Sequence, residues 1–192
     1  MMDTHLSRER GLTLVELLVA IVSMVVILGA ATGLAITAIA RQKVAFDASR
    51  LEATHTELAK AIFYAIKTAD SFQIFDDASS ANLSSIRSYG VGSSSGDYLS
   101  CRHSLIDAGG PGELVEQDYE FVRTSTDGSG TLVRTVRFLS SGRHEIRREF
   151  AGVIAARPIF SMGNGIPQAH WSIATSLDRA DFDVYAMPLS MQ

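Results

Sequence analysis

The feature that most constrains this chain is a long apolar run near its N-terminus. Residues 17–40 contain no Asp, Glu, Lys or Arg, and between residues 12 and 40 the only charged residue is Glu16. A helix needs about 20 apolar residues to cross the hydrocarbon core of a bilayer, and this run is longer. Its polar residues carry hydroxyls that can return their hydrogen bonds to the helix backbone, as at Thr32 and Thr37. The run predicts a transmembrane helix over residues 12–40.

The residues after the run distinguish it from an ordinary secretory signal. Such a signal has an apolar stretch of about 7–15 residues followed by a cleavage site of small residues. Here Ala40 leads straight into Arg41, and no Gly or Pro occurs between Arg41 and Asp70. We therefore expect an amphipathic continuation of the same helix over residues 41–70. Its apolar residues recur on one face, at Val44, Leu51, Leu58, Ile62 and Ile66.

The segment from Arg8 to Leu18, with Gly11, Leu12 and Glu16 at its centre, resembles the processing site of type IV prepilins and type II secretion pseudopilins. The resemblance implies that residues 1–11 are a leader, which a prepilin peptidase removes after Gly11. The mature chain would then begin at a methylated Leu12, with Glu16 as its fifth residue. The family usually has Phe where Leu12 stands, and Leu keeps that position large and apolar.

The same resemblance implies where the protein works and what it meets. The helix would anchor the chain in the inner (cytoplasmic) membrane, with the C-terminal domain outside the cytoplasm, and would later form the core of a filament. Its partners would be the prepilin peptidase, an inner-membrane assembly platform and other pilin-like subunits. Residues 58–70 also resemble the matching stretch of the minor pseudopilin J and of related minor pilins, which favours a minor subunit.

The carboxylate of Glu16 is expected to pair with a positively charged group. A carboxylate among apolar residues at membrane depth costs at least about 2.5 kcal/mol unless it is paired. Cleavage after Gly11 would create an ammonium group at Leu12, and in the family the Glu of one subunit pairs with the amine of a neighbour. The alternative is an interfacial Glu near the end of a signal anchor, whose carboxylate reaches the headgroups.

Gly29 and Gly33 form a G-x-x-x-G pattern within the apolar run. Such a pattern lets two helix backbones approach closely, so both glycines are candidates for helix packing. The pattern also fits the general richness of transmembrane helices in Gly, which would give these two positions no specific role. A third possibility is that the glycines soften the helix during assembly.

The C-terminal part of the sequence favours an antiparallel sheet. Residues 79–100 hold nine serines and three glycines, so residues 71–97 are expected to be a connecting loop, with the sheet domain over residues 98–192. Short turn-forming segments separate runs of strand character, which favours antiparallel hairpins. The runs are residues 98–105, 114–123, 132–139, 145–153, 169–175 and 182–186. The fold class is therefore α+β, and the resemblance implies a pilin-like fold with the long helix packed on the sheet.

Few residues suggest chemistry. Asp178, Asp181 and Asp183 could offer oxygen ligands to calcium, but their spacing is not that of an EF-hand loop, and a solvated acidic turn is the simpler interpretation. Cys101 has no second cysteine to pair with and is expected to be buried, and nothing completes a metal or catalytic site around it and His103. We predict no catalytic, cofactor-binding or metal-binding residues.

Charge and composition separate the remaining hypotheses. The formal net charge is −4 and no polybasic stripe is present, which argues against nucleic-acid binding as the main function. One predicted hairpin nevertheless contains five arginines: Arg134, Arg137, Arg143, Arg147 and Arg148. A competence-type minor pilin that contacts DNA therefore stays an alternative. A signal-anchored exported enzyme or binding protein is the other alternative.

Trp171 is expected to anchor the core, with partner binding as its second possible role.

Overall fold

The computed structural model describes residues 13–83, 93–105, 112–139, 145–155, 158–175 and 178–189. The chain divides into two compact units, one ending at Phe46 and the other beginning at Asp47. The fold class is α+β, because a long N-terminal helix precedes an antiparallel sheet, as the sequence predicts.

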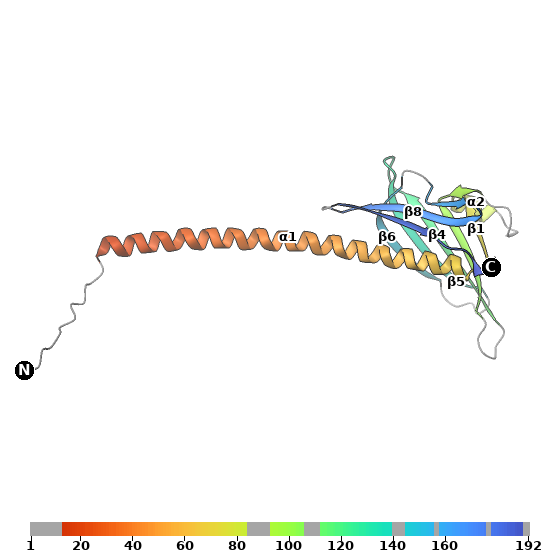
Figure 1. The fold of residues 1–192 in the computed structure, drawn as a ribbon, viewed down its shortest axis with the longest axis horizontal. Helices are drawn as coiled ribbons and strands as arrows, with labels where there is room; N and C mark the ends of the chain where they lie inside the picture. The colour runs from red at the N-terminus through yellow and green to blue at the C-terminus, as the bar shows by residue number, and fades with distance from the viewer. Residues whose placement is uncertain are drawn as a thin grey trace, which may run out of the picture. The chain divides into compact units, whose positions relative to one another are not determined.

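Helix α1 runs without a break from Leu14 to Thr68 (Figure 1). In the first unit the side chains of α1 are exposed. The threonine hydroxyls there donate hydrogen bonds to backbone carbonyls of the preceding turn. Thr32 Oγ1 donates to Leu28 O at 2.7 Å and Thr37 Oγ1 donates to Gly33 O at 2.8 Å. The hydroxyls therefore need no other partner, as expected for residues within an apolar environment.

Within the described ranges nine strands form one sheet, in which every pairing is antiparallel. The strands follow one another in the order β1-β3-β4-β5-β6-β8-β7-β2, and β9 pairs with β8 outside this path. Their bounds are β1 Ser71–Phe75, β2 Ser95–Gly96, β3 Tyr98–Leu105, β4 Glu113–Arg123, β5 Ser129–Phe138, β6 Ile146–Ile154, β7 Phe160–Gly163, β8 Ile166–Ala174 and β9 Arg179–Tyr185.

The prediction of a connecting loop over residues 71–97 was wrong in part. This region contains β1, β2 and a short helix, α2 (Ala78–Leu83), while residues 84–92 lie outside the described residues. Asp77 caps α2, since its Oδ1 accepts the Ser80 N–H at 2.7 Å. The serine-rich region thus includes the start of a helix, and β1 alternates polar and apolar residues from Ser71 to Ile74.

The core of the second unit lies between the last turns of α1 and the sheet. Leu58, Ile62 and Ile66 are fully buried there, which confirms the predicted apolar face for these three residues. Val44, placed on the same face by its spacing, is exposed because it belongs to the first unit. Leu51 is partly buried and packs against the edge of the core.

Positive φ angles mark the sharpest backbone features of the sheet. Asn164 (φ 54°) and Gly165 (φ 79°) form the two-residue turn between β7 and β8, which is typical of a type I′ hairpin. Gly152 (φ 79°) is the extra residue of β6 where the register with β5 shifts, between Gly130 and Thr131. It therefore forms a bulge that bends this part of the sheet.

Candidate functional site

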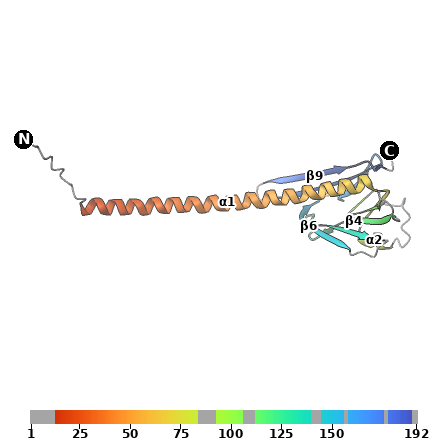
Figure 2. The same ribbon diagram turned by 90° about the horizontal axis from the view of Figure 1, so that it is seen from below.

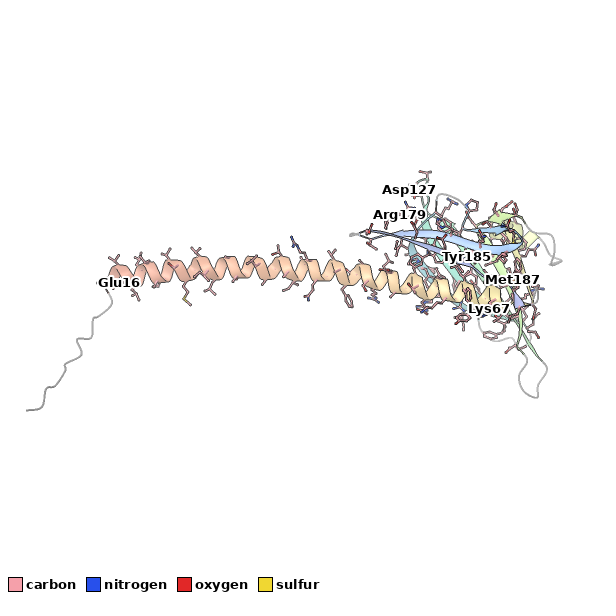
Figure 3. All side chains as sticks on the ribbon, viewed as in Figure 1. Glu16, Lys67, Asp127, Arg179, Tyr185 and Met187 are labelled. Carbon is pink, nitrogen blue, oxygen red and sulfur yellow. The ribbon has the colours of Figure 1, made fainter. Side chains whose placement is uncertain are left out.

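Glu16 lies in the first turn of α1 (Figure 3) and completes a capping box with Thr13. Its Oε2 accepts hydrogen bonds from the Thr13 N–H and the Thr13 hydroxyl, each at 2.9 Å, and the Glu16 N–H donates to Thr13 Oγ1 at 3.3 Å. These bonds satisfy backbone N–H groups at the helix start that have no partner within the helix. Glu16 therefore stabilises the N-terminus of α1 in addition to any role in assembly.

The Thr13 contacts leave part of the carboxylate available. Both hydrogen bonds reach Oε2, and no described residue donates a hydrogen bond to Oε1. The N-terminus of a helix carries a partial positive charge, which further stabilises an ionised carboxylate in this turn. Gly11 and Leu12, the predicted processing residues, lie outside the described residues.

The surface of α1 before the second unit is apolar and exposed. One stretch of this helix is long and apolar enough to cross a membrane, and a signal sequence near an N-terminus can also meet this criterion. A Cβ added at Gly29 or Gly33 would meet no atom within 4 Å. The two glycines thus form an open strip of the helix surface where another backbone would have room to approach.

A buried histidine in the second unit escaped the sequence-based predictions. His55 and Trp171 are both fully buried, and the Trp171 Nε1–H donates to His55 Nδ1 at 3.2 Å. Since Nδ1 accepts this bond, the proton of the neutral ring is on Nε2, which donates to Ala151 O at 3.0 Å. Burial lowers the pKa of His55, and the hydrogen bond to Ala151 opposes that shift. The pair joins α1 to β8 and β6.

A sequence signal for His55 was present. Leu51, His55, Leu58 and Ile62 follow one another at spacings of four, three and four residues, which places His55 on the buried face of the helix. Trp171, predicted to anchor the core, does so: its ring stacks on Phe182 with centroids 5.4 Å apart. The apolar face of the helix therefore contains one polar side chain that needs a partner in the core.

The arginines of the predicted hairpin are largely paired. Arg137 Nη1 lies 2.5 Å from Asp118 Oδ2, a carboxylate that is almost fully buried on β4. Arg148 forms two hydrogen bonds with Glu57 of α1, and Arg147 lies 3.2 Å from Glu149. Arg134 donates to Gln117 Oε1 at 3.1 Å, and Arg143 lies outside the described residues. These contacts reduce the positive charge that the hairpin offers to an external phosphate.

The remaining candidate residues do not assemble into a chemical site within the described ranges. Asp178, Asp181 and Asp183 are exposed; Arg179 Nε lies 3.4 Å from Asp181, and His170 Nδ1 lies 2.6 Å from Asp183. In the part of the chain that the structure describes, no three His, Cys, Asp or Glu residues are placed to hold a metal ion.

Cys101 and His103 are buried on β3, as the prediction of a buried cysteine requires. Burial raises the pKa of the Cys101 thiol, and the nearby Asp118 carboxylate adds to that shift. A thiol in this environment stays protonated and is a poor nucleophile.

We compared the chain with protein-family models, with curated proteins and with solved structures, and no significant match was found in any of the three comparisons.

Proposed function

We propose that this chain is a structural subunit, of the minor class, in a type IV pilus-like or type II secretion pseudopilus filament. It would have a pilin-like fold, lose its leader after Gly11, and keep its C-terminal domain outside the cytoplasm. One observation carries the proposal. A prepilin-like processing sequence directly precedes an uninterrupted apolar helix whose only charged residue before Arg41 is Glu16.

The geometry of Glu16 is compatible with this role. Thr13 holds Oε2, so the carboxylate is already oriented in the first turn, and Oε1 can receive the N-terminal amine of a neighbouring subunit. A positively charged amine would offset the cost of keeping the carboxylate at membrane depth. Capping satisfies the start of the helix, whereas the pairing would also set the axial position of one subunit against the next.

The sheet domain supports a structural role because its strongest polar groups serve its own fold. His55 binds Trp171, and the buried Asp118 binds Arg137. We propose that this domain acts through surface contacts with other subunits and has no enzymatic activity. The DNA-contacting alternative is less favoured, since four hairpin arginines already bind side chains of the same chain.

The test is maturation and assembly of the full chain in cells that carry its own filament system. Mass spectrometry of the intact protein should show a chain that begins at a methylated Leu12. Processing after the apolar run, near Ala40, would instead identify a signal sequence and refute the proposal. A purified chain that binds DNA with a steep salt dependence would favour the competence-type alternative.

Two substitutions separate pairing from capping. Thr13→Val removes the hydroxyl of the capping box and leaves the carboxylate, while Glu16→Gln keeps a group that can accept the Thr13 bonds but removes the charge. If Glu16 pairs with an amine, Glu16→Gln should abolish filament assembly and Thr13→Val should weaken it. Normal assembly of Glu16→Gln would refute the pairing. Ser23→Ala, within the same helix, is the control.

A further inference from the structure

Strand β9 has a neighbour on one side only. It pairs with β8 from Arg179 to Tyr185, and no other strand of the described ranges pairs with it. At β1, the first strand in the sheet order, another segment of the chain covers the outer edge. There the Ser93 N–H donates to Ile74 O at 2.9 Å and the Asp97 N–H donates to Asp76 O at 3.1 Å, so the segment around β2 covers that strand. Among the residues that the structure describes, β9 is thus an edge of the sheet that no segment covers.

Alternation of the backbone identifies which β9 residues face outward. The His170 N–H donates to Ile159 O at 2.8 Å, so the backbone of His170 faces away from β9. In an antiparallel ladder the next residue faces the other way, which directs the backbone of Trp171 towards β9. Trp171 lies opposite Phe182, so Phe182 is a residue of β9 whose backbone faces β8.

The residues on either side of Phe182 therefore present their backbone groups to the outside. They are Asp181, Asp183 and, by the same alternation, Tyr185. Among the described residues no backbone or side-chain group hydrogen-bonds to the outer N–H and C=O groups of these three. This edge carries no Lys, Pro or bulge, and the charged side chains that it presents against unwanted pairing include Asp181 and Asp183.

A groove runs beside this edge. It lies between β9 and the last turns of α1, which are close to one another in Figure 2, and has a volume of about 480 Å³. Its walls come from Asp183 to Tyr185 on one side and from four residues of α1 on the other: Ala59, Lys60, Phe63 and Tyr64. Tyr64 and Tyr185 are 60% and 66% exposed, so two aromatic rings border the groove without being covered.

We propose that the outer edge of β9 and this groove bind an extended segment of another protein, which adds to the sheet as an antiparallel strand. The unpaired backbone groups would bind its backbone. Its side chains would point alternately into the groove and towards the face of Asp181 and Asp183. On the groove side Ala59 and Phe63 are among the lining residues, which favours apolar residues there. The two aspartates favour Lys or Arg at the alternate positions.

Charge is what distinguishes such a partner from a second copy of this chain. Pairing β9 with β9 of a second copy along its full length, with Arg179 opposite Tyr185, places Asp181 opposite Asp183 twice. Like charges directly opposite one another destabilise a strand pair. The aspartates already have a neighbouring cation or imidazole, but their side chains are still 58% and 64% exposed, so both are accessible to a basic strand.

The experiment uses the full chain, purified in a non-ionic detergent, and a labelled seven-residue peptide of alternating Lys and Val with blocked ends. Fluorescence anisotropy should show binding that is about tenfold tighter than that of the matching Glu and Val peptide. In antiparallel pairing the residues opposite Asp181 and Asp183 direct their backbone at β9. N-methylation of the peptide's lysines should therefore abolish binding, and N-methylation of its valines should not.

A matched pair of variants tests the site on the protein. Asp183→Pro removes an outward N–H but no hydrogen bond to β8, and should abolish peptide binding. Asp183→Asn keeps that N–H and should weaken binding about fivefold at most. Binding that survives Asp183→Pro, or N-methylation of the lysines, would overturn the proposal.

Amide exchange in the unmodified chain keeps the proposal testable if Asp183→Pro fails to fold. The peptide should slow exchange of the amides of Asp181, Asp183 and Tyr185 and leave those of Phe182 and Val184 unchanged, since the latter already face β8. Equal slowing at all five amides would overturn the proposal. Protection of the three outward amides that rises with protein concentration, with no peptide present, would also overturn it and would identify a second copy as the occupant.

Discussion

Replacing His55 with leucine should destabilise the second unit at neutral pH, and this loss should become smaller as the solution is acidified. Leucine fills much of the same space but cannot accept the Trp171 Nε1–H, which lies 3.2 Å from His55 Nδ1 in a fully buried position. A buried donor without a partner costs about 1–3 kcal/mol. Ala151, the other partner, is exposed, so water can replace His55 at its carbonyl. The expected loss of unfolding free energy is therefore about 1–3 kcal/mol.

The pH dependence follows from the direction of the His55 pKa shift. Burial lowers the pKa in the folded state, while in the unfolded state it lies near 6.5. The unfolded chain therefore binds more protons below about pH 6.5, and the contribution of His55 to stability is lost as the pH falls towards the folded pKa. One proton changes the unfolding free energy by at most about 1.4 kcal/mol per pH unit. His55→Leu has no such group, so its gap to the unmodified chain should narrow.

The assay is guanidinium unfolding of the full chain in detergent between pH 5 and 8. Trp171 is the only tryptophan of the chain, so its fluorescence reports directly on this part of the core. His170→Asn, which alters an exposed histidine, serves as the control and should leave the unfolding free energy nearly unchanged. A gap between His55→Leu and the unmodified chain that is below about 1 kcal/mol, or that stays constant over the pH range, would refute this account of the histidine.

Three further predictions concern the same unit. Gly128→Ala should lower the unfolding free energy more than Gly165→Ala does. Both glycines have positive φ, but only a Cβ at residue 128 would meet another atom, Ala155 O at 2.6 Å. The expected losses are about 3 kcal/mol and about 1 kcal/mol, measured by chemical unfolding. Arg137→Ala should cost about 3 kcal/mol, because it leaves the buried Asp118 carboxylate without its partner, whereas Arg147→Ala breaks an exposed pair and should cost less than about 1 kcal/mol; equal effects would contradict this. The Cys101 thiol should resist an aromatic disulfide reagent at pH 8 in the folded chain and react fully in guanidinium, and rapid reaction of the folded chain would show that Cys101 is accessible.

Sequence reasoning predicted the elements whose signals are local and strong. The apolar run and the absence of Gly and Pro from Arg41 to Asp70 predict the uninterrupted helix α1, and the strand expected over residues 98–105 has the bounds of β3. For the helix and for this strand, the pattern of apolar and polar residues that predicts the element lies entirely within the element's own sequence. The filament hypothesis concerns other chains, so it stays a prediction.

The elements that the sequence concealed depend on their neighbours. β7 has four residues, too few for a clear alternation, and is stabilised by pairing with β8 across the Asn164-Gly165 turn. β1 alternates only from Ser71 to Ile74 and lies beside a serine-rich stretch that obscured it, and its register is set by β3. His55 has a role only because Trp171, 116 residues later, donates to it. Long-range partners of this kind cannot be read from one segment alone.

The division of the chain at Phe46 has a consequence for genetics. Leu51 is the first residue of α1 that packs against the core, and no side chain of residues 14–46 belongs to that core. A variant in that stretch that loses function while the unfolding transition of the second unit is unchanged has been altered in what the helix meets outside the chain. A random mutant library would thus separate into two phenotypic classes, and Gly29, Gly33 and Glu16 would belong to the class whose protein is folded but inactive.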